Sequence, residues 1–224
     1  MKTAQRILLT ALTLFNEHGE NAVTSVDIAL ELDISPGNLY YHYKGKEVMV
    51  SALLQLHQKQ MLTLLVAKSE EALTAEDVFY YFYLLIDQLH LFRFFYRSPA
   101  DLNEKYPDTQ RTRNRLMKAL SGRLQQLLES LVSRKELIAS QADIRLLTEL
   151  MQLIMLQACQ HDVQSQTMDE EAQRYHALSL LMVTLLPRLK LPEAHIHAIQ
   201  AAIHSHTLAN VQTRKTPESL VLGE

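Results

Sequence analysis

The chain has 224 residues, of which 47% are hydrophobic and only 5 are Gly and 6 are Pro. This balance favours helices over a turn-rich sandwich, and the length allows one sizeable core or a small module joined to a larger one. The net charge of −3 excludes nucleic-acid binding by bulk basicity, so any such binding must use a local surface.

The compartment follows from the cysteine content and from the N-terminus. A single cysteine, Cys159, excludes an internal disulfide and cannot alone form a thiolate metal site. The N-terminal apolar run is interrupted by Thr10 and Thr13 and is not followed by a small-residue cleavage site. The longest uncharged apolar run, residues 178–186, is about half of the roughly 20 residues that cross a bilayer. We therefore expect a cytoplasmic protein without a membrane span.

The first helix is predicted by a helical stripe near the N-terminus. Its members follow a 4, 3, 4 spacing: Ile7, Ala11, Leu14 and His18. We expect a helix over residues 3–18 that Gly19 ends. Thr24 and Asp27 then form an S/T-x-x-D/E capping box, which predicts the start of a short second helix.

A third helix is predicted from residue 36 to about 43. Ser35 is a suitable N-cap and Pro36 suits the first helical position. Leu39 and Tyr43, at i and i+4, form one inward face, so the neighbouring residues point elsewhere. Two short helices joined by a tight turn and braced by a longer one form a helix-turn-helix, whose second helix can enter a DNA major groove about 12 Å wide.

The third helix carries side chains suited to DNA. Tyrosine rings can contact thymine methyl groups or donate to phosphates, Asn38 can bond a base edge, and His42 and Lys46 can meet phosphate oxygens. Lys46 also opens the next helix, whose free amides favour an anion, and the same holds for Thr24 and Ser25. The alternative is that the Tyr-Tyr-His-Tyr run is interior packing. However, four adjacent helical residues cannot all face inward at 3.6 residues per turn.

Residues 1 to about 54 resemble the DNA-binding domain of TetR-family transcriptional regulators. The resemblance rests on FNEHGENAVTSVDIA, on ISPGNLYYHYKGKE and on the lysine that opens the fourth helix. It implies that operator DNA is contacted by Thr24, Ser25, Gly37, Asn38, Tyr40, Tyr41, His42 and Lys46. We add Ser35, the predicted N-cap of the third helix, to these candidate DNA-binding residues. Val26 departs from the pattern, because many relatives have a basic or polar side chain there.

Charge limits how this module can bind. Four basic and six acidic side chains leave residues 1–50 with a net charge of −2. Few phosphates can then be neutralised per subunit, so we expect a modest salt dependence and a strong need for dimerisation.

An aromatic segment is the candidate for effector binding. Residues 76–96, expected as one helix, hold nine of the fifteen aromatic residues, so this helix should be largely buried or should line a cavity. Its polar members, which include Asp87, His90 and Arg93, recur every three residues and can orient a ligand. The candidate ligand-binding residues are Tyr83, Asp87, His90 and Phe94, and the expected effector is a small apolar or aromatic molecule. The alternative is a core helix with a solvated polar edge.

The remaining chain also reads as helices. We expect a fourth helix over 46–68, a short sixth helix that starts at a Ser98 to Asp101 capping signature, and a long seventh helix that ends near 133. Two late helices carry apolar stripes in 3, 4 steps with further leucines beside them, so one face can serve the core and another a partner. In TetR-like proteins the late helices form the dimer interface, which implies helices near 141–161 and 170–187.

The sequence thus predicts an all-α protein. An N-terminal three-helix helix-turn-helix domain (1–48) precedes a larger helical ligand-binding and dimerisation domain (49–210) and a polar tail (211–224). The expected function is a ligand-responsive, homodimeric transcriptional regulator that binds double-stranded operator DNA, and by family analogy a repressor. We expect no catalytic residues and no cofactor, because the sequence has no nucleophile with a base at recognisable spacing and no glycine-rich phosphate loop. We expect no metal, because the C-terminal histidine pairs are spaced i, i+2. A helical enzyme or metal protein, and a helical adaptor that binds protein, remain as alternatives.

Overall fold

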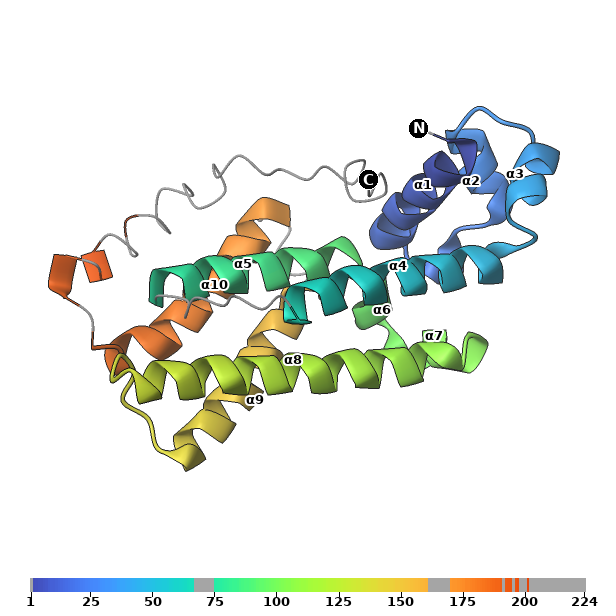
Figure 1. Ribbon diagram of the computed structural model, residues 1–224. Coiled ribbons are helices and arrows are strands. Elements are labelled where there is room, and N and C mark those ends of the chain that lie inside the picture. Colours follow the sequence, from blue (N-terminus) through green and yellow to red (C-terminus); the bar gives the residue numbers. More distant parts are fainter. Residues whose placement is uncertain are drawn as a thin grey trace.

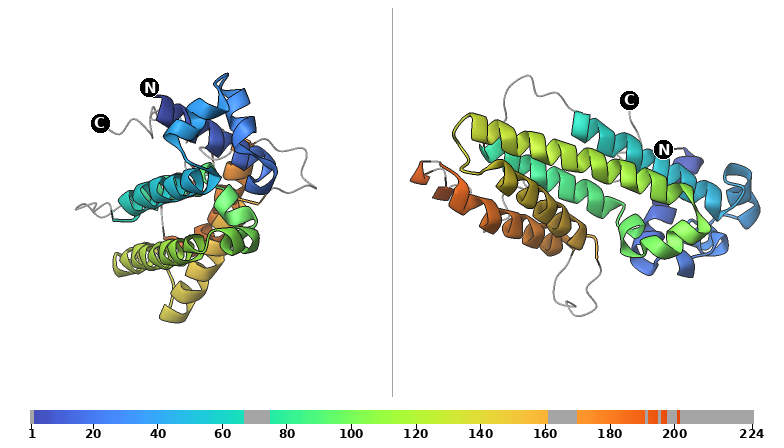
Figure 2. Two further views of the ribbon diagram at one scale, coloured as in Figure 1. Left: turned by 90° about the vertical axis from the view of Figure 1, so that its right-hand side faces the viewer. Right: turned by 90° about the horizontal axis from the view of Figure 1, so that it is seen from below.

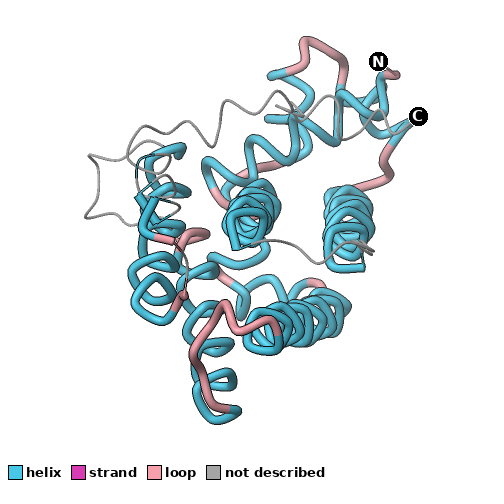
Figure 3. The backbone as a smooth tube through the Cα atoms, turned by 60° about the vertical axis from the view of Figure 1, so that its left-hand side comes forward, coloured by secondary structure: helices cyan, strands magenta, loops and turns pink. Residues whose placement is uncertain are grey.

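The computed structural model describes residues 2–66, 75–160, 170–190, 192–194, 196–197 and 201. Over these ranges the chain is helical, and the extended pairing consists of one antiparallel bridge between Leu137 and Leu189 (Figure 3). The predicted all-α class is confirmed. In the same ranges, no helix is long and apolar enough to cross a bilayer. Other expected positions lie outside the described residues: the end of the fourth helix at 67–68, residue 161, His195, His204, His206 and the tail 211–224.

The N-terminal domain has the predicted helices. They are α1 (Thr3–His18), the 3-10 turn η1 (Glu20–Ala22), α2 (Ser25–Glu31) and α3 (Pro36–His42). Their shared core is closed by apolar side chains with no more than 3% exposure: Ile7, Ala11, Phe15, Val23, Ile28, Ala29 and Leu39. This domain lies at one end of the molecule, with α3 at its outer edge (Figure 1).

The larger C-terminal part begins within a continuous helix. Its elements are α4 (Lys46–Val66), α5 (Ala75–Leu91), α6 (Phe94–Arg97), α7 (Pro99–Lys105), α8 (Asp108–Ser133), α9 (Gln141–Gln157), α10 (Glu170–Leu185) and η2 (Leu186–Arg188). Helix α4 runs out of the N-terminal domain and packs against α8 and α5 (Figure 1). Helices α9 and α10 lie side by side along one flank (Figure 2).

The prediction of a single helix over residues 76–96 is wrong. The helix α5 ends at Leu91, and a separate helix α6 begins at Phe94. The cause is Asn16 of α1, whose side-chain amide donates to the Leu91 carbonyl (2.9 Å) and accepts from the Phe94 amide (3.1 Å). A side chain inserted into the i to i−4 ladder breaks a helix, and the chain here tightens into i to i−3 bonds instead.

The starts of two later helices differ from expectation. Ser98 precedes α7 with ψ of 66°, and its side chain makes no capping bond, so the expected capping box is absent. Ser140, which the sequence reading did not single out, has the extended conformation of an N-cap with ψ of 170° and forms a full box with Asp143. The backbone conformation before the helix decides whether a serine can cap it.

Substitution of Asn16 tests whether its hydrogen bonds join the N-terminal domain to the C-terminal part. Replacing Asn16 by Ala leaves the Phe94 amide and the Leu91 carbonyl without their partner in a buried site, so we expect the free energy of unfolding to fall by about 2 kcal/mol or more. Chemical denaturation checks this loss. The exposed Asn114→Ala substitution on α8 is the control and should change stability by less than about 0.5 kcal/mol. Equal stability of both variants would contradict the assigned role of Asn16.

Candidate DNA-binding surface, pocket and dimer face

The turn between α2 and α3 sets the direction of α3. Asp33 adopts a left-handed φ of 53°, and the amide of Ile34 donates to the Ala29 carbonyl at 3.0 Å. These two features end α2 in a Schellman-type turn. Ser35 then caps α3, because its hydroxyl oxygen accepts from the Asn38 amide at 3.1 Å. The predicted cap at Ser35 is thus confirmed.

One side chain anchors α3, and most of the others point away from the protein. Leu39 is 1% exposed, whereas Tyr40 is 59% and Tyr41 is 82% exposed. Gly37 and Asn38 are exposed as well, and His42 is half-buried with its ring edge-on to Tyr41. At the end of the helix the Tyr43 hydroxyl donates to the Ala4 carbonyl at 3.2 Å and ties α3 to α1. A flat outward face of hydroxyl, amide and ring groups results.

Gly37 leaves open space on this face. A Cβ atom built there would meet only the Ser35 hydroxyl, at 3.9 Å. The protein's own packing therefore does not require glycine at this position. A glycine without an internal reason suits a surface to which another molecule comes close.

The start of α2 lies beside this face. The Thr24 amide and hydroxyl both donate to the Asp27 carboxylate at 2.7 Å, and the Thr24 oxygen accepts from the Asp27 amide at 3.2 Å. This is the predicted capping box. Thr24 is exposed and Ser25 is half-buried, so the free amides at this helix start remain accessible.

Lys46 points into the protein rather than outward. Its ammonium donates to the Glu20 carboxylate (2.7 Å) and to the carbonyls of Glu20 (2.8 Å) and Val23 (2.9 Å). Three acceptors match the three donors of a lysine. Glu20 explains this position, because its carboxylate is only 4% exposed and also accepts from Lys105 (3.3 Å) and Tyr106 (2.7 Å). At the start of α4, only the backbone amides are therefore left to bind an external anion.

The Glu20 cluster was missed in the sequence reading, because its members lie up to 86 residues apart. Burial raises the pKa of Glu20, but the hydrogen bonds from Lys46, Tyr106 and Lys105 lower it more, so the pKa lies below its ordinary value of 4.5. A depressed pKa means that the cluster stabilises the fold above about pH 4.5 and that this stabilisation is lost as the pH falls.

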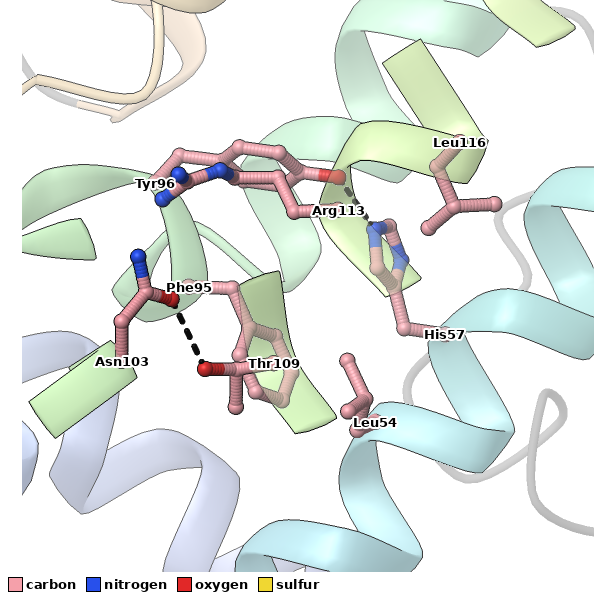
Figure 4. A pocket seen from close by; sticks show the side chains of 8 residues that line it. All are labelled: Leu54, His57, Phe95, Tyr96, Asn103, Thr109, Arg113 and Leu116. Carbon is pink, nitrogen blue, oxygen red and sulfur yellow. Dashed lines mark hydrogen bonds between the residues drawn. The ribbon is translucent and has the colours of Figure 1, made fainter. Parts of the chain in front are cut away.

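A pocket lies between α4, α6, α7 and α8 (Figure 4). Its free volume is about 10 Å³, room for about one water molecule. Its lining is Leu54, His57, Phe95, Tyr96, Asn103, Thr109, Arg113 and Leu116. The His57 Nε2 and the Tyr96 hydroxyl are 2.6 Å apart, and the Thr109 hydroxyl donates to the Asn103 side chain at 2.9 Å. Full burial lowers the pKa of His57 to about 3, so its ring is uncharged at neutral pH. The hollow is mainly apolar, with a few convergent polar groups.

The four residues predicted to bind a ligand lie outside this pocket. The Tyr83 ring packs on Tyr175 of α10, with ring centres 5.5 Å apart, and Asp87 pairs with Arg174 at 3.3 Å. The remaining two also have partners in the protein. His90 Nδ1 lies 3.1 Å from the Ala158 carbonyl, and Phe94 packs on Phe15 of α1. The expected burial of the aromatic segment is confirmed, but its Asp87, His90 and Arg93 face α10 and the end of α9. Sequence reasoning missed His57 and Arg113, which are isolated residues on separate helices.

Apolar side chains remain exposed on the two late helices. The stripes expected to serve the core are buried, including Ile144, Met151 and Leu178. Beside them, exposed leucines and a valine form a set that we call the flank face: Leu146 (65%), Leu150 (42%), Leu153 (66%), Leu180 (40%) and Val183 (72%). This division into an inner and an outer apolar face is the one that the sequence predicted.

Two family models match the chain. One, described as bacterial regulatory proteins of the tetR family, matches residues 7–53, and the other, a TetR bacterial transcriptional repressor domain, matches residues 56–195. Among curated proteins, the regulator QacR of Staphylococcus aureus is 29% identical over 115 residues. That match covers 47% of this chain and 61% of QacR.

Solved structures share the fold. A TetR-family regulator from Marinobacter aquaeolei superposes with a TM-score of 0.77 at 23% identity, covering 92% of this chain and 99% of the other. The SmeT–triclosan complex superposes with a TM-score of 0.58 at 18% identity, covering 82% of this chain and 91% of SmeT.

The buried carboxylate of Glu20 generates a pH test. We expect the free energy of unfolding of the native chain to fall as the pH drops below about 4.5, and Glu20→Gln to flatten this dependence because its amide cannot titrate. Urea denaturation between pH 3.5 and 7 measures both slopes. Glu31→Gln, on the exposed side of α2, is the control and should keep the native slope. An unchanged acid slope in Glu20→Gln would refute the assigned role of the cluster.

Proposed function

Because the chain belongs to the TetR family of bacterial transcriptional regulators, we propose that it is a cytoplasmic repressor that binds a palindromic operator as a homodimer and is released by a small, largely apolar effector. The observation that carries the proposal is the outward face of α3, with Tyr40, Tyr41 and Asn38 exposed around the buried anchor Leu39. Two exposed tyrosine rings and an amide beside a tight turn suit the floor and edges of a major groove.

Contacts to the DNA backbone come from residues at the starts of α2 and α3. Ser35, Thr24 and Ser25 lie at helix starts, where free amides and a positive dipole end favour phosphate. Lys46 contributes in a different way from the one expected. Its ammonium holds Glu20, so it fixes the start of α4 and leaves the amides of this helix start to meet a phosphate.

The flank face supports a symmetric dimer. Five large apolar side chains are exposed on two helices that pack against each other, and exposed apolar patches mark association sites. A two-fold pairing of α9 and α10 would place two α3 helices on one side of the dimer. Recognition helices about 34 Å apart then read two half-sites one helical turn apart.

A continuous set of hydrogen bonds joins the pocket to the DNA-binding domain. Helix α6 supplies Phe95 and Tyr96 to the pocket, and its first amide is held by Asn16 of α1. Its last residue, Arg97, donates to the carbonyls of Asn16 and Cys159, which belong to α1 and to the end of α9. A ligand that displaces Phe95 or Tyr96 therefore moves the residues that position α1. It can shift the equilibrium only by its differential affinity for the two arrangements.

Gly37→Ala separates DNA binding from folding. The added methyl has space within the protein, so we expect stability to stay equal or rise by about 0.5 to 1 kcal/mol. On the outward face of α3 the same methyl obstructs close approach, so affinity for DNA flanking the encoding gene should fall about tenfold or more. Fluorescence anisotropy of labelled DNA measures this affinity. The control is Gly122→Ala on α8, where an added Cβ also meets nothing within 4 Å.

Tyr41→Ala should weaken binding to the same DNA, since this ring is the most exposed on α3. Lys46→Ala is a poorer test, because it also leaves Glu20 without its closest cation. Native affinity in both Gly37→Ala and Tyr41→Ala would remove α3 as the DNA-contacting helix.

The dimer face has its own test. A double substitution of Leu146→Glu and Leu153→Glu places two carboxylates within the flank face, and we expect sedimentation to show a monomer where the native chain is a dimer. The control is Leu30→Glu, at a residue 71% exposed on α2 and away from the flank face. A doubly substituted chain that remains dimeric, or a native chain that is monomeric, would place the interface elsewhere or exclude it.

A further inference from the structure

The pocket has one charged wall. Of its eight lining side chains only Arg113 carries a formal charge, and none is a carboxylate. Across the ranges that the structure describes, no hydrogen bond or ion pair engages the Arg113 guanidinium. The neighbouring imidazole of His57 is neutral because burial lowers its pKa to about 3. An unpaired cation beside a low-polarity hollow attracts a negative charge.

The rest of the lining suits a flat hydrocarbon body. Leu54, Leu116 and the ring of Phe95 supply apolar surface, and the Tyr96 ring belongs to the same lining as Arg113 (Figure 4). Aromatic walls favour an aromatic ligand through offset or edge contacts. In addition, Nδ1 of His57 is buried and has no hydrogen-bond partner in the described part of the chain, so one polar atom of the wall is unused.

Charge and size narrow the ligand class further. The planar guanidinium matches a carboxylate with two parallel hydrogen bonds. One cation balances one negative charge, so a dianion such as a phosphate monoester would keep a negative charge without a partner in the lining. The free volume of the pocket is about 10 Å³, room for about one water molecule, so only a small ligand that displaces lining side chains such as Phe95 can enter it.

We propose that the effector is a small aromatic monocarboxylic acid, bound with its carboxylate against Arg113 and its ring between Leu54, Phe95 and Leu116. This assignment rests on the proposed function, because it takes the pocket to be the effector site. Binding would separate Tyr96 and Phe95 from their present neighbours and so act on α6.

Binding of benzoate and of its neutral isostere benzamide tests the charge requirement. By isothermal titration calorimetry on the full chain we expect benzoate to bind at least tenfold more tightly than benzamide. Arg113→Gln should reduce this ratio to about one, whereas Arg115→Gln, at an exposed arginine on the same helix, should leave it unchanged. Salicylate and salicylamide form a second pair of probes, and sodium sulfate at equal ionic strength controls for charge without a ring.

The possible results distinguish failure of the proposed ligand class from failure of the proposed function. The proposal is overturned if the amides bind as tightly as the acids, if sulfate competes equally with benzoate, if Arg113→Gln keeps the preference, or if neither acid binds. Anisotropy of labelled DNA is measured in parallel. DNA binding without acid binding removes only the ligand class, whereas acid binding without DNA binding at any salt concentration removes the proposed function.

Discussion

The proposed DNA-binding surface depends on the packing of one side chain, Leu39, which lies beneath a helix of seven residues. A helix this short is not stable in water by itself, so α3 exists only because the protein around it supplies a core, a cap and a C-terminal tie. Leu39 supplies the core contact, Ser35 the cap and Tyr43 the tie to α1. Because all three fix the inner side, the outer side is free to be polar and aromatic without a cost in stability.

A few side chains likewise join the N-terminal domain to the C-terminal part of the chain. Asn16, near the end of α1, and Glu20, at the start of η1, lie four residues apart, and each reaches across to the C-terminal part. Asn16 holds the α5–α6 break, and Glu20 draws together Lys46 and Tyr106. Buried polar groups that satisfy one another fix a unique geometry, because a partly satisfied arrangement is costly. The position of the DNA-binding domain is therefore linked to the helices that line the pocket.

Two features set by neighbouring residues were predictable from the sequence, whereas those set by distant residues were not; the local pattern was wrong at Ser98 and missed Ser140. The capping box at Thr24 and the cap at Ser35 involve residues three apart, so the local pattern contains the whole interaction. The break before Phe94 is caused by a side chain 78 residues away, and nothing in the local pattern records it. The direction of Lys46 depends on Glu20, and the pocket combines eight residues from four helices. Residue type alone identified the aromatic segment as buried, but not which neighbour each polar group meets.

The central claim is that two outward α3 faces, related by two-fold symmetry, read DNA together. Enrichment of fragments from the source genome by the purified protein, followed by sequencing, tests it directly. We predict an inverted repeat whose half-sites are centred about one turn of the double helix apart. Absence of any enriched sequence, or an enriched motif without two-fold symmetry, would contradict this account.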